Sequence, residues 1–285
     1  MPELPEVQTV VDTLASRIVG CTIQSVDLAR TDILTPQDCD LCAHLTGRRV
    51  ESVTRRAKRI VITLDDGNRF YVHLGMSGRL TVELSDAPRP KHTHCVIRFE
   101  SSELHFADPR RFGGIWWLGK DASNEEELGP EPLTLGARAL AARLSRTTRA
   151  IKNVLLDQTV IAGLGNIYAD EALFESRIHP LRRADRLTND EVTQLNRAIK
   201  RVLRRALKHK GSTLRDYRDA NGESGTFQKL HRVYDREGQP CWRCKGPIKR
   251  IVLGGRSTHF CPRCQPHIAR RMRRAKSKLI HQLCW

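Results

Sequence analysis

The first six residues of the chain, Met1-Pro2-Glu3-Leu4-Pro5-Glu6, place a potential nucleophile beside two acids. Methionine before a small residue such as proline is normally removed, and the new terminus would be the secondary amine of Pro2. An α-amino group titrates near ~7.7–8.0, so a useful fraction is uncharged at neutral pH and can attack an electrophilic carbon to form an imine. Glu3 and Glu6 lie within one turn of that nitrogen and could move protons for it. The same residues also fit an ordinary helix start, with proline and acids in the first turn.

Four cysteines toward the C-terminus have the spacing of a metal site. Two C-x2-C pairs are separated by sixteen residues, and they consist of Cys241, Cys244, Cys261 and Cys264. Four thiolates form a closed tetrahedral shell with no position for substrate, so we expect one structural zinc ion. The residues between the pairs predict a hairpin whose turn carries Gly254, Gly255 and Arg256, so the finger would present an arginine. Cys39 and Cys42 also have chelating spacing but lack a second pair, and we interpret them as unrelated thiols.

The composition indicates a polyanionic partner. Among 285 residues, 49 Lys and Arg stand against 32 Asp and Glu, a net charge of +17. Such an excess favours nucleic acid first and an acidic membrane surface second. No apolar run of ~18 residues is present, so no membrane span is expected. The acidic N-terminus does not resemble a signal peptide, so we expect the nine cysteines in a reducing compartment, where close pairs hold metal.

The order of elements predicts an α+β protein with two domains. A helix over residues 4–19 is followed by short strands to about residue 118, which predicts an N-terminal β-sandwich or barrel domain over 2–120. The following segments are a linker over 121–135, a helical domain over 136–226, a four-cysteine finger over 232–266 and a basic extension over 267–285.

Local signals place several elements inside these domains. Strands over Val50–Leu64 and Arg69–Leu74 flank the turn sequence Asp65-Asp66-Gly67-Asn68. Residues 137–158 form one helical stretch that we expect to be broken once. Thr188 and Glu191 have the spacing of a capping box, which predicts a helix from there to about Lys210.

Taken together, these features resemble the formamidopyrimidine-DNA glycosylase family, which repairs oxidised purines in DNA. The resemblance runs from Pro2 to about Gln265, and residues 266–285 extend beyond the usual end of that family. Its motifs are Pro2-Glu3-Leu4-Pro5-Glu6-Val7, Arg55-Arg56-Ala57-Lys58, His73-Leu74-Gly75-Met76-Ser77-Gly78, Asp108-Pro109-Arg110-Arg111-Phe112-Gly113, Leu128-Gly129-Pro130-Glu131-Pro132-Leu133, Gly163-Leu164-Gly165-Asn166-Ile167-Tyr168-Ala169 and the cysteine ribbon. The resemblance implies a helix–two-turn–helix unit in the second domain and a β-hairpin zinc finger.

The resemblance also implies a mechanism. Pro2 would attack C1′ of the damaged nucleotide and expel the base, with Glu3 as the acid/base and Glu6 as a supporting acid. The resulting iminium would acidify the C2′ proton, so that β- and δ-elimination cut the DNA on both sides of the lesion. Lys58 would contact phosphate and assist β-elimination, and Arg256 would grip the lesion phosphate.

The family also implies how the DNA is held. A damaged base must be flipped out of the duplex before attack, and other side chains must fill the hole. Met76, Arg110 and Phe112 match the filling residues, because apolar side chains wedge between base steps and arginine offers paired donors. Phosphate contacts are expected from the start of the helix after Gly165 and from His92, Arg110, Lys152 and Asn166.

The sequence also leads us to expect a binding partner and a cellular location, and it leaves alternative functions open. We expect a monomer that binds double-stranded DNA with a damaged base in the bacterial cytosol, near the nucleoid, with no membrane contact and no catalytic metal or organic cofactor. Endonuclease VIII, which prefers oxidised pyrimidines, shares Pro2, Glu3 and the ribbon. The loop over residues 221–228 resembles the lesion-covering loop of the purine enzyme and therefore favours the formamidopyrimidine-DNA glycosylase family over endonuclease VIII. A non-catalytic zinc-ribbon DNA-binding protein and a ribosome-associated RNA-binding protein explain the charge but not the Pro-Glu start.

Overall fold

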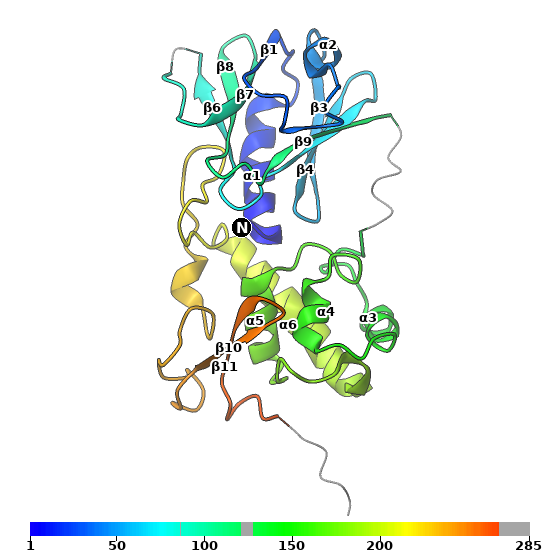
Figure 1. Ribbon diagram of the computed structural model, residues 1–285, viewed down its shortest axis with the longest axis vertical. Coiled ribbons are helices and arrows are strands. Elements are labelled where there is room, and N and C mark those ends of the chain that lie inside the picture. The colour runs from blue at the N-terminus through cyan, green and yellow to red at the C-terminus, as the bar shows by residue number, and fades with distance from the viewer. Residues whose placement is uncertain (86, 121–127, 268–285) are drawn as a thin grey trace, which may run out of the picture.

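The computed structural model describes residues 1–85, 87–120 and 128–267. A β-rich domain and a helical domain lie one above the other along the long axis, and the chain start lies at their junction (Figure 1). Residues 121–127 of the expected linker and nearly all of the expected basic extension lie outside the described residues.

Helix α1, Leu4–Ile18, confirms the helix expected over residues 4–19. Val7, Val10, Leu14 and Ile18 repeat with the period of a helix and are buried in the core of the N-terminal domain. Leu4, at the other end of the helix, belongs instead to the core of the helical domain. The helix therefore fixes its own first residues at the boundary between the domains.

Two sheets share the first core and confirm the expected β-rich domain. One has the strand order β1-β7-β8-β6 and the other the order β2-β9-β5-β4-β3, in which only β2 and β9 are a parallel pair. The strands are β1 Ser25–Leu28, β2 Leu34–Thr35, β3 Val50–Arg56, β4 Arg59–Leu64, β5 Arg69–His73, β6 Arg79–Leu84, β7 Thr93–Arg98, β8 Ser102–Ala107 and β9 Gly114–Gly119, and a short helix α2 spans Leu41–Leu45.

One strand prediction was wrong in detail. The stretch expected as a single strand over Val50–Leu64 is two antiparallel strands, β3 and β4, joined by a tight turn at Ala57 and Lys58. Ala57 has a positive φ of 55°, a conformation that residues with a Cβ rarely adopt. The sequence contains no glycine or asparagine here, so the usual turn signal was missing. The turn places Lys58 at the tip of a hairpin.

Helices in the second domain lie where the sequence predicted helical segments. The expected broken helix is α3, Ala137–Leu144, and α4, Ile151–Leu156. The others are α5, Asn166–Glu175, and α6, Asn189–Lys208, with short 3-10 turns at Ala184–Arg186 and Phe227–Leu230. Thr188 caps α6 and forms the predicted capping box with Glu191.

The finger is a hairpin of β10, Lys249–Leu253, and β11, Arg256–Phe260. Leu253 pairs with Arg256, so Gly254 and Gly255 form a two-residue turn, and their φ values of 55° and 71° suit glycine. Before the finger, the segment around Tyr217 and Ala220 returns to the N-terminal core. No helix of the described residues is long and apolar enough to cross a membrane.

Candidate active site

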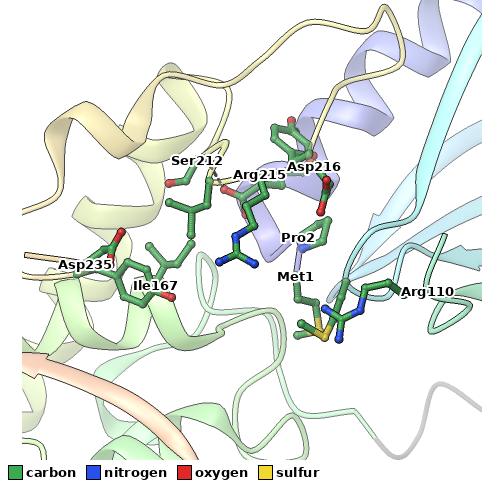
Figure 2. Close-up of a pocket in the computed structure, with 13 residues that line it drawn as sticks. Met1, Pro2, Arg110, Ile167, Ser212, Arg215, Asp216 and Asp235 are labelled. Carbon is green, nitrogen blue, oxygen red and sulfur yellow. Dashed lines mark hydrogen bonds between the residues drawn. The ribbon is translucent and has the colours of Figure 1, made fainter. Parts of the chain in front are cut away.

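A cavity of about 370 Å³ lies at the junction of the domains, at the start of α1 (Figure 2). Pro2 lies in its wall together with Met76 and Arg110 from the N-terminal domain. The opposite wall comes from the loop after α6, where the side chain of Arg215 projects into the cavity (Figure 2). The loop over residues 221–228, which was expected to cover the lesion, contributes no described residue to the wall of this cavity. Ser212 and residues 214–217 line it instead.

The N-terminal amine, carried here by Met1, is partly buried beside this cavity. Burial lowers the pKa of the amine from its usual 8.0, although the carboxylates of Glu3 and Glu6 oppose the change. The positive charges of Lys58 and Arg256 lower the pKa further. An amine in this environment is neutral, and therefore nucleophilic, in a larger fraction of molecules at neutral pH.

Glu3 is buried between the domains, and its carboxylate accepts hydrogen bonds from backbone N–H groups at the start of helix α5. The backbone N–H groups of Gly165 and Ile167 donate to Glu3 Oε2 and Oε1 at 2.8 and 2.9 Å, and that of Tyr168 donates at 3.3 Å. A Cβ on Gly165 would lie 2.5 Å from Glu3 Oε1, so glycine is required by the close approach. Burial raises the pKa of Glu3, while the charge of Lys58 and these N–H groups oppose it. The site thus holds Glu3 in place and increases the fraction of Glu3 that carries a proton.

Glu6 lies one turn further along α1 and is buried among donors. Its carboxylate accepts from the backbone N–H groups of Glu3 and Ser212, at 2.9 and 2.6 Å, and from the hydroxyl of Tyr168. Burial first, and then the charge of Glu3, raise the pKa of Glu6 to about 7. Glu6 is therefore partly protonated at neutral pH and limits the negative charge beside the amine.

Lys58 is placed by a network that sequence reasoning missed. Only 8% of its surface is exposed, and burial lowers its pKa while Glu3 and Glu6 oppose the change. The turn that carries it is held by Glu131, which accepts from the Ala57 N–H at 2.7 Å and pairs with Arg55 at 2.6 Å. Glu131 belongs to a motif that carried the family resemblance, but spacing alone could not show that it reaches a turn more than seventy residues away.

The predicted wedge residues lie on two neighbouring loops. Met76 and Phe112 are exposed, and the guanidinium of Arg110 lies 4.8 Å from the Phe112 ring centroid. The buried carboxylate of Asp108 joins the two loops. It accepts from the Ser77 hydroxyl at 2.6 Å and from backbone N–H groups of Arg110, Phe112 and Gly113 at 3.2, 2.9 and 2.8 Å.

His92 lies at the surface just before β7, near the same loop. Its carbonyl accepts from the Asp108 N–H at 3.1 Å, so the backbone of His92 is tied to the residue that joins the wedge loops. Its exposed side chain is open to a ligand. The predicted phosphate contact of His92 remains a prediction.

The finger is docked on the helical domain by buried polar groups. Ser257, which follows the exposed Arg256, accepts through its carbonyl from Lys152 Nζ at 2.8 Å and from Asn166 Nδ2 at 2.9 Å. Lys152 also forms a fully buried ion pair of 2.6 Å with Asp170. The ammonium group of Lys152 therefore supports the finger from inside and does not face solvent in this structure, and its expected phosphate contact remains a prediction. Asn166 is at the expected helix start, but its amide also holds the finger.

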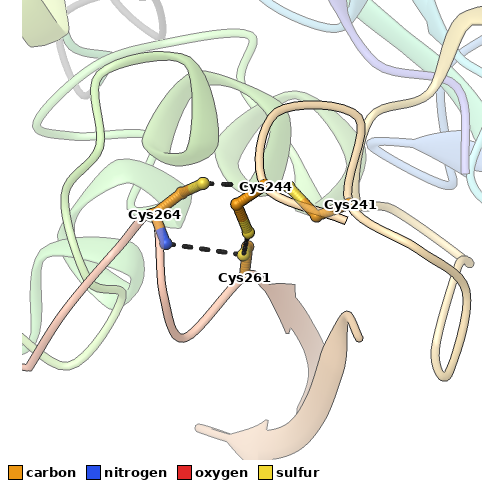
Figure 3. A group of neighbouring side chains, drawn as sticks. All are labelled: Cys241, Cys244, Cys261 and Cys264. Carbon is orange, nitrogen blue, oxygen red and sulfur yellow. Dashed lines mark hydrogen bonds between the residues drawn. The ribbon is translucent and has the colours of Figure 1, made fainter. Parts of the chain in front are cut away.

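The four predicted cysteines come together at the base of the finger (Figure 3). Their sulfur atoms all lie within 4.8 Å of one another, and the Cys241–Cys264 and Cys244–Cys261 pairs are separated by 3.8 and 3.4 Å. Tetrahedral zinc with bonds of about 2.3 Å places its sulfur ligands roughly 3.8 Å apart. The donor set and its dimensions fit one structural zinc ion, which stabilises the hairpin that presents Arg256.

Three family models match successive parts of the chain. The model described as the formamidopyrimidine-DNA glycosylase N-terminal domain matches residues 1–115, and the model described as the H2TH domain of the same enzyme matches residues 128–218. A model described as a zinc finger found in FPG and IleRS matches residues 238–266.

Individual relatives agree with these models over nearly the whole chain. The formamidopyrimidine-DNA glycosylase of Roseiflexus sp. (strain RS-1) is 48% identical over 274 residues, which cover 93% of this chain and 100% of the relative. A relative of the same name from Solibacter usitatus (strain Ellin6076) is 45% identical, with coverage of 93% and 99%. The structure of Lactococcus lactis Fpg with abasic-site DNA is similar to this chain with a TM-score of 0.88 and 36% sequence identity. The structure of a variant of that protein with Fapy-dG DNA has a TM-score of 0.87 and 36% sequence identity. Both structures cover 93% of this chain and 100% of their own.

The β-rich domain, the helical domain and the four-cysteine finger around a terminal amine define the class of zinc-finger DNA glycosylases. The chain belongs to the formamidopyrimidine-DNA glycosylase family.

Proposed function

We propose that this protein excises oxidised purines, 8-oxoguanine and formamidopyrimidines, from double-stranded DNA and then nicks the abasic site. The observation that carries this proposal is the position of the chain start. An amine with a lowered pKa lies in a cavity beside a buried glutamate with a raised pKa, in a member of a glycosylase family. Related proteins have been crystallised with DNA containing an abasic site or Fapy-dG.

In the first stage, loss of Met1 exposes the secondary amine of Pro2. The Pro2 nitrogen forms a bond to C1′ and gives up its N–H proton, while the bond between C1′ and the base breaks. The electron pair of that bond leaves on the base, which takes up the proton. Glu3 transfers its proton to O4′ as the C1′–O4′ bond opens, which leaves an iminium ion on Pro2. The raised pKa of Glu3 increases the fraction of the enzyme in which Glu3 carries the proton that this step requires.

In the second stage, the iminium withdraws electrons and acidifies the C2′ proton. Removal of that proton expels the 3′ phosphate, and a further elimination expels the 5′ phosphate. The lowered pKa of Lys58 suits it to proton transfer at this stage, whereas Arg256 supplies a permanent positive charge for the lesion phosphate. Hydrolysis of the remaining imine restores Pro2.

The net charge of +17 and the bacterial origin of the relatives support a role near the nucleoid in the bacterial cytosol. We propose that the protein acts there as a monomer, with Met76, Arg110 and Phe112 in the duplex and His92 on phosphate.

Incision of defined duplexes tests the proposed function. An 8-oxoguanine–cytosine duplex should give fragments with phosphate at both ends of a one-nucleotide gap, and Glu3→Gln should remove this activity. A duplex with 5,6-dihydrouracil represents the alternative substrate class, the oxidised pyrimidines. Faster incision of the dihydrouracil duplex than of the 8-oxoguanine duplex would favour an endonuclease VIII-like function. Binding of both duplexes without incision of either would favour a non-catalytic DNA-binding role.

A further inference from the structure

A second cavity lies directly beside the active-site cavity. It has a volume of about 470 Å³, and three of its lining residues, Leu214, Tyr234 and Asp235, also line the cavity that contains Pro2. The two cavities therefore share a wall. The mechanism described above gives the second cavity no role.

The second cavity contains an aromatic surface that is only partly covered. Trp242 exposes 53% of its surface, which is unusual for the largest apolar side chain. The guanidinium carbons of Arg232 and Arg236 lie 4.7 and 5.3 Å from the centroid of its ring. These arginines pack on the ring, and about half of the surface of the residue remains exposed to solvent.

The walls around Trp242 are held rigidly. Trp242 lies between two predicted zinc ligands, Cys241 and Cys244, so the metal fixes its backbone. Arg236 donates to the Gln239 side chain at 2.9 Å and to the carbonyls of Arg232 and Pro240 at 2.7 and 3.0 Å. A rigid site of this kind loses little conformational entropy when a ligand binds.

A buried side chain also holds the backbone of the wall that the two cavities share. The buried carboxylate of Glu171 accepts from the N–H groups of Arg232, Val233 and Tyr234 at 2.9 to 3.0 Å. The wall between the cavities is thus anchored to helix α5. The first turn of this helix also donates a backbone hydrogen bond to the carboxylate of Glu3.

The chemistry of the cavity favours a nucleobase. A tryptophan face stacks on any base, and adjacent guanidinium groups favour an electron-rich ring or a nearby phosphate. The amides of Gln228 and Gln239 line the same cavity and offer both donors and acceptors for a base edge. Among the described lining residues, Asp235 is the only acid.

We propose that the second cavity is a nucleobase-binding subsite in which a purine base stacks on Trp242. The base has two sources, an excised purine that leaves the active-site cavity or a base of the DNA strand near the lesion. Binding at this subsite requires no bond cleavage, so the inference goes beyond the excision reaction.

Equilibrium dialysis of the zinc-loaded full chain tests the subsite. The probes are free 8-oxoguanine and, separately, a short single-stranded oligodeoxyadenylate. Trp242→Ala should weaken binding of at least one probe by about fivefold or more, because a base–aromatic stack is typically lost on such a change. Trp242→Phe should bind nearly as the wild type, because it keeps a stacking face.

Val252→Ala is the matched control, since Val252 is an exposed apolar residue on the same finger. One zinc ion per chain in each variant shows that the finger has folded. A loss confined to free 8-oxoguanine assigns the subsite to the excised base, and a loss confined to the oligonucleotide assigns it to the strand.

The proposal is overturned if neither probe binds, or if Trp242→Ala binds both probes as tightly as the wild type. Because no incision is measured, this result is independent of the excision assay. Failure of the subsite leaves the excision result unaffected, and failure of excision leaves the binding result interpretable.

Discussion

Glu3 and Glu6 lie three residues apart on one helix, yet their surroundings give them different tasks. Glu3 is tied to backbone N–H groups of the opposite domain, whereas Glu6 shares its carboxylate with Tyr168, Ser212 and the Glu3 backbone. Burial raises both pKa values, and the charge of Glu3 raises the pKa of Glu6 further. The site therefore holds two acids close to the amine without requiring two full negative charges.

The contact between Gly165 and Glu3 gives a steric test at the scale of one residue. Gly165→Ala adds a Cβ that overlaps the Glu3 carboxylate, so Glu3 must move. We expect the single-turnover rate of base excision to fall by roughly 10²-fold or more, the usual contribution of a positioned acid. Gly136→Ala is the control, because a Cβ there meets nothing within 4 Å. Equal rates for the two variants would show that the position of Glu3 does not matter for excision.

The raised pKa of Glu6 predicts a pH dependence of stability. In the folded protein Glu6 keeps its proton up to about pH 7, whereas the unfolded chain releases it near 4.5. The stabilising contribution of the proton is complete below pH 4.5 and is lost as the pH rises to about 7. At about 1.4 kcal/mol per pKa unit the loss is roughly 3 kcal/mol. Denaturant unfolding of wild type and Glu6→Gln should show this change in their difference, and a difference constant from pH 4 to 8 would contradict it.

At the scale of elements, short segments from distant parts of the sequence hold one another. The hairpin tip with Lys58 is fixed by Glu131, and the finger is fixed by Lys152 and Asn166 on the carbonyl of Ser257. The wedge loops follow the same principle, because Asp108 ties both of them together.

Asp108→Asn tests whether the shape of these loops governs the choice of opposite base. The amide keeps one acceptor oxygen and presents a donor to the remaining N–H groups, so the loop that carries Arg110 should loosen. If Arg110 contacts the base opposite the lesion, a good contact is worth about 1–3 kcal/mol of discrimination. The ratio of incision opposite cytosine to incision opposite adenine should then fall severalfold.

Asp32→Asn is the control for this change, because Asp32 pairs with Arg111 of the same loop at the exposed surface. It should leave the ratio unchanged. A lower rate with the wild-type ratio in Asp108→Asn would mean that the loops support binding and not base choice.

The sequence predicted those elements whose signals are local. Helix α1, the capping box at Thr188 and the four-cysteine cluster were each predicted close to their observed positions, because periodicity, capping and chelate spacing act over a few residues. The turn at Ala57 and the burial of Lys152 were not predicted. Their causes, Glu131 and Asp170, lie far away in the sequence, and only the folded chain brings them together.

At the scale of the whole molecule, the positive charge is much larger than the site alone needs. Residues 267–285 contribute six basic residues and no acid, namely Arg270, Arg271, Arg273, Arg274, Lys276 and Lys278. We predict that this extension adds affinity for DNA of any sequence. Each phosphate neutralised on a duplex adds about 0.9 to the slope of log K against log salt, so three contacts would add about 2–3.

Deletion of residues 267–285 should therefore weaken binding most at low salt, for lesion and undamaged DNA alike. Fluorescence anisotropy over a range of salt concentrations measures both slopes. Equal slopes for the two proteins would show that the extension makes no phosphate contacts. A loss limited to lesion incision would instead indicate that it supports the finger.

The central claim is that the amine at the junction of the domains is the nucleophile. The most direct measurement is borohydride reduction of the protein with 8-oxoguanine DNA, followed by mass spectrometry of the cross-linked peptide. We predict a reduced adduct on the nitrogen of Pro2 in a chain that lacks Met1, and no adduct when Met1 is retained. An adduct that maps to an internal lysine such as Lys58, or undiminished trapping with Met1 in place, would contradict the claim.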